Sequence, residues 1–90
     1  MRYRKKPVIV DAFQVPLAGE DKSPFRKWCK SVGFVDTSRH DGDLSIRTLD
    51  GEMWARPGYY IIKDVDGEFS PCRPDVFAET YLPIDPEVDL

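Results

Sequence analysis

The sequence predicts a small α+β domain: a twisted, mainly antiparallel sheet of five or six short strands, open or curved into a half-barrel, with one amphipathic helix and a short C-terminal helix. At 90 residues the chain can bury one modest core. Two Asp-Gly pairs, at 50–51 and 66–67, lie between apolar runs and are typical of β-hairpins. Eight prolines divide the chain into short elements and argue against long helices.

Composition and charge limit the classes of function. The net charge of −3 at pH 7 disfavours general nucleic-acid binding. No apolar run reaches the roughly 18–20 residues of a membrane helix, and the run after the basic start is too short for a signal peptide. Cys29 and Cys72 have no metal-binding spacing, so we expect reduced thiols, no metal and no cofactor. The sequence therefore predicts a cytoplasmic protein with no membrane partner.

Charge is unevenly distributed along the chain. Four basic residues crowd the first six positions: Arg2, Arg4, Lys5 and Lys6. Residues 75–90 hold five acidic residues and no basic one. Either the two ends lie near each other and neutralise, which is the interpretation we favour, or the basic arm meets an anion. We expect a single domain over residues 1–84, followed by an acidic tail over residues 85–90.

Residues 7–15 are rich in β-branched residues, lie between two prolines and predict the first strand. Both faces of this strand are largely apolar, which indicates a central position in the sheet. Asp11 interrupts the apolar run. It lies either at a bulge or an edge, or it is buried and paired with a base such as Arg4 or Lys63.

Residues 23–32 predict the amphipathic helix. Ser23 is a favoured cap, Pro24 a favoured first helical residue, and Gly33 is typical of a left-handed C-terminal cap. The apolar residues fall on one helical stripe: Phe25, Trp28, Cys29 and Val32. We expect the basic residues opposite this stripe to form a solvated face rather than an anion site.

Residues 37–43 predict a polar loop, which follows a short strand at residues 34–36. The loop contains the one histidine of the chain, His40, near three carboxylates. Such a set can bind a divalent metal. Its composition is also that of an exposed loop tip, and this is the interpretation we favour.

Residues 44–56 predict a β-hairpin around Asp50-Gly51. A two-residue turn there pairs Arg47 with Trp54 and places Arg56 on the same face. The opposite face is apolar and is expected to lie in the core: Leu44, Ile46, Met53 and Ala55.

An indole between two guanidinium groups is a platform for an aromatic ring and a phosphate. The hairpin therefore predicts a ligand-binding site, to which lysines near the sheet edge are added. The predicted binding residues are Arg47, Trp54, Arg56, Lys5, Lys6 and Lys63. Two alternatives stay open: the indole is covered by arginine side chains, or it forms a contact in a homo-oligomer.

Residues 59–72 predict a second hairpin. A four-residue loop pairs Lys63 with Glu68 and Ile62 with Phe69. A short helix follows, begun by a proline and packed back through two aromatic residues four positions apart: Phe77 and Tyr81.

Two segments carry a resemblance. Residues 4–12 read R-K-K-P-V-I-V-D-A and resemble the pattern R-K-K-P-V-x-V-[ED]-A. Residues 57–81 are similar to P-G-D-Y-I-I-K-G-V-x-G-E-F-Y-P-C-K-P-D-I-F-x-x-T-Y, and the non-conservative departures are at Tyr59, Asp64 and Ser70. Both patterns occur together in a widespread family of small tailed-phage and prophage proteins of unknown function. The resemblance implies a phage gene product that acts in the host cytoplasm, and it implies no activity.

Three functions follow as hypotheses. We favour a small phage accessory protein that acts as a non-catalytic binding module for a host protein or an anionic, nucleotide-like small molecule, because the sequence lacks recognisable catalytic spacings. The second is a virion structural or assembly protein that oligomerises through Trp54. The third is a small enzyme that uses Cys72, where Arg73 would favour the thiolate, although a cysteine between two prolines is more often packed.

Overall fold

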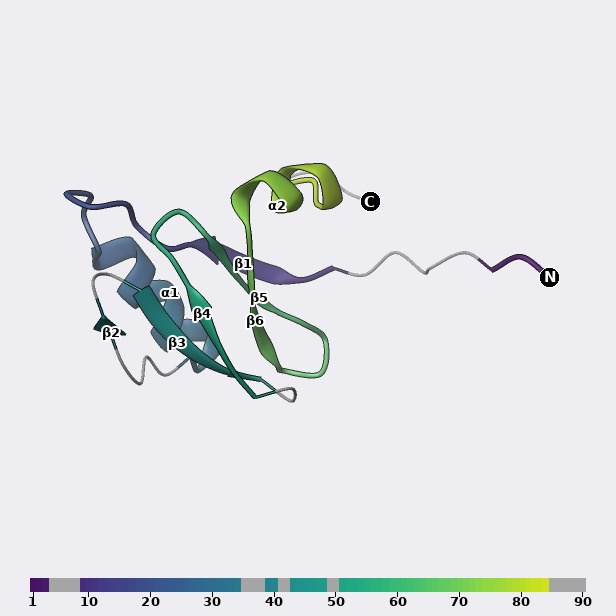
Figure 1. Ribbon diagram of the computed structural model, residues 1–90, viewed down its shortest axis with the longest axis horizontal. Coiled ribbons are helices and arrows are strands. Elements are labelled where there is room, and N and C mark those ends of the chain that lie inside the picture. The colour runs from purple at the N-terminus through teal and green to yellow at the C-terminus, as the bar shows by residue number, and fades with distance from the viewer. Residues whose placement is uncertain (4–8, 35–38, 41–42, 49–50, 85–90) are drawn as a thin grey trace.

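The computed structural model describes residues 1–3, 9–34, 39–40, 43–48 and 51–84. This part of the chain contains two helices and six strands, drawn in Figure 1. In chain order they are β1 (Asp11–Gln14), α1 (Ser23–Val32), β2 (Arg39–His40), β3 (Asp43–Thr48), β4 (Gly51–Ala55), β5 (Tyr60–Lys63), β6 (Phe69–Cys72) and α2 (Pro74–Thr80).

The strands form two antiparallel sheets, of order β1-β5-β6 and β2-β3-β4. The predicted α+β class with antiparallel pairing is confirmed, but one sheet is replaced by two. The turn after β4 explains the division. The Gly58 amide donates to the Val15 carbonyl at 2.9 Å, and the Val15 amide donates to the Tyr59 carbonyl at 2.7 Å. These bonds lead the chain away from β4 and into pairing with β1. The segment predicted as a polar loop contains β2.

β1 is an outer strand of its sheet, and the prediction of a central strand is wrong. Asp11 is exposed and lies across from Lys63, so its position is the edge rather than the buried alternative. The strand is apolar because its inner face is covered by the helix. The Phe13 ring lies 6.0 Å from the Phe25 ring and 5.7 Å from the Trp28 ring, measured between centroids.

α1 packs against the sheets with the predicted stripe. Phe25 is buried, while Trp28, Cys29 and Val32 are half-buried against the core. One cluster of buried side chains joins the helix to both sheets: Val15, Phe25, Phe34, Leu44, Ile46, Ala55 and Ile61. The single modest core expected for a chain of this length therefore lies between α1 and the strands.

The ends of α1 follow the predicted chemistry with one change. Gly33 ends the helix in the left-handed region, at a φ of 79°. At the start, Lys22 rather than Ser23 is the cap residue. The Asp21 carboxylate accepts a hydrogen bond from the Ser23 amide at 2.9 Å, so this carboxylate takes the capping role that the serine hydroxyl was expected to have.

The β3–β4 hairpin closes two positions away from the predicted register. Thr48 pairs with Gly51 rather than with Met53, and residues 49–50 lie outside the described part. The Thr48 hydroxyl donates to the Gly51 carbonyl at 2.8 Å, which favours this closure. A shift of two positions keeps every side chain on its predicted face. The core prediction is confirmed for Leu44, Ile46 and Ala55, but Met53, nearer the turn end of the hairpin, is 44% exposed.

The β5–β6 hairpin has a five-residue loop, because Lys63 pairs with Phe69 rather than with Glu68. The Asp64 carboxylate explains the extra residue. It accepts hydrogen bonds from the amides of Asp66 at 2.9 Å and Glu68 at 3.2 Å, and so stabilises the longer turn. A one-residue slip exchanges the faces, which places Phe69 on the same face as Ile61 instead of Ile62.

α2 lies on the opposite side of the first sheet from α1. Phe13, which contacts α1, pairs with Ile61, whereas the neighbouring Tyr60 points to the other face. The Phe77 ring of α2 stacks on the Tyr60 ring at 3.8 Å, as the predicted packing of this helix requires. Figure 1 shows the two helices at separate places on the molecule, with the N-terminus apart from both.

Candidate functional site

Three of the six predicted binding residues lie at one surface, on the outer side of the β3–β4 hairpin. Arg47 is in β3, Trp54 is in β4, and Arg56 is two residues further along the chain. All three are exposed, and Trp54 keeps 45% of its surface accessible. The alternative of a covered indole is therefore wrong, since neither α1 nor another described element buries this side chain.

The observed register changes the neighbours of the indole. Trp54 lies across from Ser45, and Arg47 lies across from Glu52, so the predicted Arg47–Trp54 pair is wrong. Paired residues share a face of an antiparallel sheet, and Glu52 therefore belongs to the same surface. We call the exposed residues of this surface the Trp54 face: Arg47, Glu52, Trp54 and Arg56.

A buried hydroxyl fixes the carboxylate of the Trp54 face. Ser45 is only 3% exposed, and its hydroxyl donates to Glu52 Oε1. A hydrogen bond to a buried polar group restrains the glutamate on the strand, because losing it would leave the hydroxyl unsatisfied. Sequence reasoning missed Glu52. Its alternation with Trp54 was visible, but the residue across from it depends on the register of the turn.

Lys63 does not contribute to the Trp54 face. Its ammonium group donates to the Val32 carbonyl at 2.9 Å and lies 5.8 Å from the centre of the Phe69 ring. A cation at a helix C-terminus is favourable, because the last carbonyls carry partial negative charge. Lys63 is thus a structural residue that ties α1 to β5. Lys5 and Lys6, the other two predicted residues, lie outside the described part.

The Trp54 face combines an aromatic ring with charges of both signs. An anion that approaches Arg47 also meets the anchored Glu52 carboxylate, which opposes its binding by like-charge repulsion. A protein surface, in contrast, can pair with both signs around a central indole, and Trp and Arg are enriched at the energetic centres of protein interfaces. The geometry favours a macromolecular partner over a phosphate.

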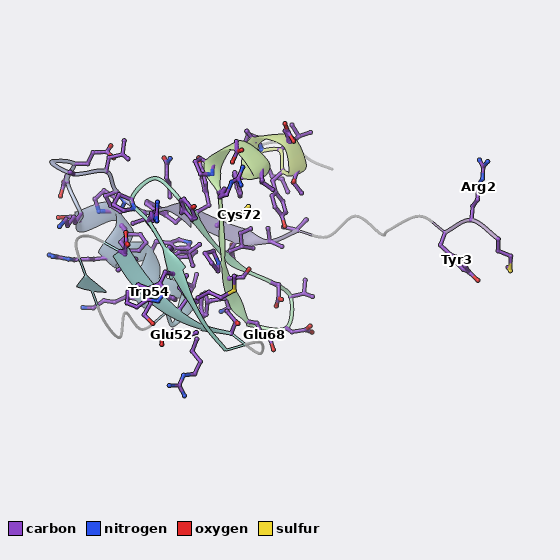
Figure 2. The ribbon with its side chains drawn as sticks, viewed as in Figure 1. Arg2, Tyr3, Glu52, Trp54, Glu68 and Cys72 are labelled. Atoms are coloured by element: carbon purple, nitrogen blue, oxygen red, sulfur yellow. The ribbon has the colours of Figure 1, made fainter. Side chains whose placement is uncertain are left out.

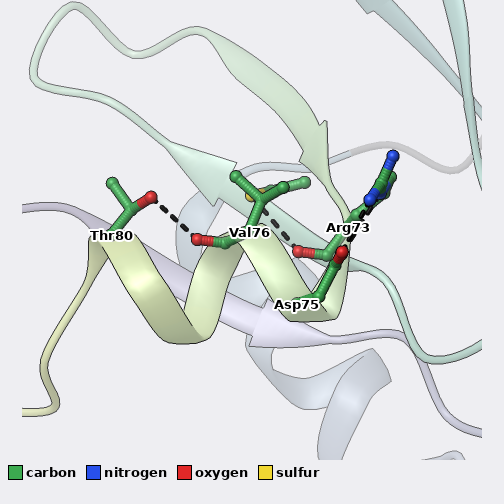
Figure 3. Close-up of polar contacts among 5 residues, drawn as sticks. Arg73, Asp75, Val76 and Thr80 are labelled. Atoms are coloured by element: carbon green, nitrogen blue, oxygen red, sulfur yellow. Dashed lines mark hydrogen bonds and ion pairs between the residues drawn. The ribbon is translucent and has the colours of Figure 1, made fainter.

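Cys72 has surroundings that disfavour a nucleophile. Burial, followed by the Asp75 charge, raises the pKa of the Cys72 thiol, while Arg73 lowers it to a smaller extent. The Arg73 guanidinium is engaged elsewhere, since it donates to both oxygens of Asp75, at 3.1 and 2.6 Å (Figure 3). The thiolate that a cysteine enzyme needs is therefore not promoted here. Figure 2 shows Cys72 well apart from Trp54.

A hollow of about 230 Å³ lies where β1 meets the start of α1. Its acidic side chains already hold the connecting loop. Glu20 Oε1 accepts a hydrogen bond from the Leu17 amide at 2.6 Å, and Asp21 accepts one from Ser23. These hydrogen bonds give both carboxylates a structural role in the loop.

Within the described residues, no group of three or more His, Cys, Asp or Glu side chains could hold a metal ion. His40 belongs to the loop whose composition also suits a divalent metal, but its side chain lies outside what the structure describes. Among the helices of the described ranges, none is long and apolar enough to span a bilayer.

Comparison with protein-family models, with curated proteins and with solved structures finds no match to this chain. The candidate site therefore rests on the geometry of the Trp54 face alone.

Proposed function

We propose that this protein is a small phage accessory protein, acting in the host cytoplasm, that binds a host protein through the Trp54 face without catalysing a reaction. The observation that carries the proposal is the position of Trp54. The indole is 45% exposed on a regular strand, between Arg56 and the Glu52 carboxylate that Ser45 fixes. The phage setting rests on the two sequence patterns at residues 4–12 and 57–81.

The exposed indole favours binding to a protein for an energetic reason. Covering a large aromatic side chain stabilises a complex through apolar burial, and a ring held on a strand loses little conformational entropy when it is bound. Charges of both signs around it contribute selectivity more than affinity. Within the hypotheses drawn from the sequence, this supports a protein partner over a nucleotide.

The neighbouring residue of the same strand supplies a matched control. Met53 is 44% exposed, almost the same as Trp54, but its side chain points to the opposite face of β4. Trp54→Ala and Met53→Ala therefore remove similarly exposed apolar side chains from two different surfaces. A partner that requires the Trp54 face will distinguish them, whereas non-specific hydrophobic adhesion will not.

The test is affinity capture of proteins from a bacterial lysate on immobilised wild-type, Trp54→Ala and Met53→Ala proteins, quantified by mass spectrometry. We expect a protein that wild type and Met53→Ala retain and Trp54→Ala loses. Equal retention by all three proteins would overturn the proposal.

Two further measurements separate the alternatives. Thermal-shift assays with ATP and GTP test the nucleotide hypothesis. A rise in melting temperature that disappears in Arg47→Ala would replace the protein partner with a nucleotide. Light scattering after size-exclusion chromatography tests the assembly hypothesis. An oligomer that Trp54→Ala dissociates and Met53→Ala preserves would assign the face to self-association instead.

A further inference from the structure

The helix α2 is attached to the body of the molecule by very few buried atoms. None of its residues is buried, and only Phe77 is half-buried. The contrast with α1 is clear, because that helix has one buried and three half-buried residues in the core. Elements with few buried apolar contacts open at lower free energy than the rest of a fold.

The contact between α2 and the sheet is a short stack of rings. The Phe77 ring lies parallel to the Tyr60 ring, at 3.8 Å between centroids and 4° between planes. On its C-terminal side, Tyr81 contacts Phe77 at 5.0 Å and 29°. Because Tyr81 immediately follows α2 in the chain, the stack on Tyr60 is the contact that crosses from the helical segment to the sheet.

Most polar contacts of the helical segment that begins at Arg73 are made within it, and one joins it to β6, where the Cys72 thiol donates to the Arg73 carbonyl at 3.6 Å. Arg73 pairs with Asp75 at 2.6 Å, and the Thr80 hydroxyl donates to the Val76 carbonyl at 2.7 Å (Figure 3). The amides of Phe77 and Tyr81 donate within the same segment, to the carbonyls of Arg73 and Phe77. These internal bonds do not hold the helix on the sheet, so separation breaks the ring stack. Once it is off the sheet, a helix of 7 residues is only marginally stable in water, and its amides exchange readily.

A single extended residue connects α2 to the sheet. Arg73, with φ −61° and ψ 144°, lies between the end of β6 and the first helical residue, Pro74. The proline ring fixes the backbone at the start of the helix. Rotation about Arg73 can therefore move the helix as one body.

We propose that α2 is a detachable strap, which swings away about Arg73 while both sheets stay folded and uncovers the outer surface of the first sheet at Tyr60 and Cys72. Tyr60 and Cys72 pair across β5 and β6, so their side chains lie together on the face that α2 covers. The half-buried thiol then reports on the strap, because its access to solvent increases when the helix leaves. The proposal does not depend on the Trp54 face.

Native-state hydrogen exchange on the wild-type protein tests the strap directly. We expect the amides of α2 to exchange at least about 100-fold faster, relative to their intrinsic rates, than those of Ile61 and Ile62 in β5. Equal protection of α2 and β5 would overturn the proposal, because the helix would then open only with the whole fold.

Alkylation of Cys72 by iodoacetamide, followed at peptide level by mass spectrometry, tests the role of the ring stack. Phe77→Ala should raise the rate about tenfold, whereas Phe77→Tyr keeps the stack and should react like wild type. Val65→Ala, at a loop position that is 72% exposed, is the control and should leave the rate unchanged. A Phe77→Ala rate within twofold of wild type would contradict the strap. If Phe77→Ala also lowers the protection of the β5 amides, the substitution destabilises the whole fold. The exchange experiment on wild type then decides whether α2 opens separately.

Discussion

The two faces of the β3–β4 hairpin contrast in exposure, although Met53 on the inner face and Ser45 on the outer face depart from the pattern. On the inner face, Leu44, Ile46 and Ala55 are 2%, 1% and 0% exposed. On the outer face, one residue away along β4, Trp54 is 45% exposed. Alternation along a strand lets the same backbone stabilise the core and present a binding surface. Substitutions on the two faces should therefore separate stability from binding.

Ile46→Ala is expected to have the largest effect on stability. Removing a fully buried isoleucine costs about 2–5 kcal/mol, out of a total unfolding free energy of about 5–15 kcal/mol. Urea unfolding followed by circular dichroism measures the change. Met53, which pairs with Ile46 across the hairpin but is exposed, is the control, and its alanine variant should lose about 1 kcal/mol or less. Equal losses would contradict the difference in burial between Ile46 and Met53.

Gly58→Ala comes next, because it strains the turn that joins the hairpin to β5. Gly58 has a φ of +90°, and an added Cβ would lie 3.2 Å from Leu17 Cδ2. Conformational strain and this close contact together should cost about 1–3 kcal/mol. Gly67, at +85°, has open space around it. Gly67→Ala therefore carries only the conformational part, and thermal melts should rank Gly58→Ala as the more damaging. The reverse order would contradict the packing described for this turn.

Lys63→Met removes the ammonium group that holds the Val32 carbonyl and retains the aliphatic stem. The lost hydrogen bond should reduce the unfolding free energy by about 1 kcal/mol without weakening partner binding. Arg47→Met, on the Trp54 face, should do the opposite: stability within about 0.5 kcal/mol of wild type, and weaker binding. Unfolding free energies and dissociation constants, measured for both variants, compare the structural role of Lys63 with the binding role of Arg47. Loss of binding in Lys63→Met would contradict the structural role and show that Lys63 contributes to binding.

The sequence predicts the elements of this fold better than their pairing. The stripe of α1, both hairpins and the Gly33 end of α1 follow from spacing and cap chemistry. The registers do not, because each is decided by one polar side chain. The Thr48 hydroxyl favours closure of the first hairpin at Gly51, and the Asp64 carboxylate lengthens the second loop by one residue. Such bonds compete with the preferred turn types and leave no mark on hydrophobic patterning.

In the candidate site, too, the sequence predicts the face on which a residue lies better than its partner across the hairpin. Alternation placed Arg47 and Trp54 on one face, and both are exposed there. Register determined which residues face each other, so the role of Glu52 and the structural role of Lys63 could not be read from the sequence. The charge of Lys63 predicts a place in the binding site. Its observed position beside the last turn of α1 depends on how the helix packs against β5.

The central claim is that Trp54 binds a partner and does not support the fold. The most direct test is the dissociation constant for the captured partner protein, measured by isothermal titration calorimetry for wild type, Trp54→Ala and Met53→Ala, with unfolding free energies in parallel. We expect Trp54→Ala to bind at least about 30-fold more weakly, with its stability within about 0.5 kcal/mol of wild type, and Met53→Ala to bind like wild type. Unchanged affinity in Trp54→Ala, or a loss of affinity that only parallels unfolding, would contradict the claim.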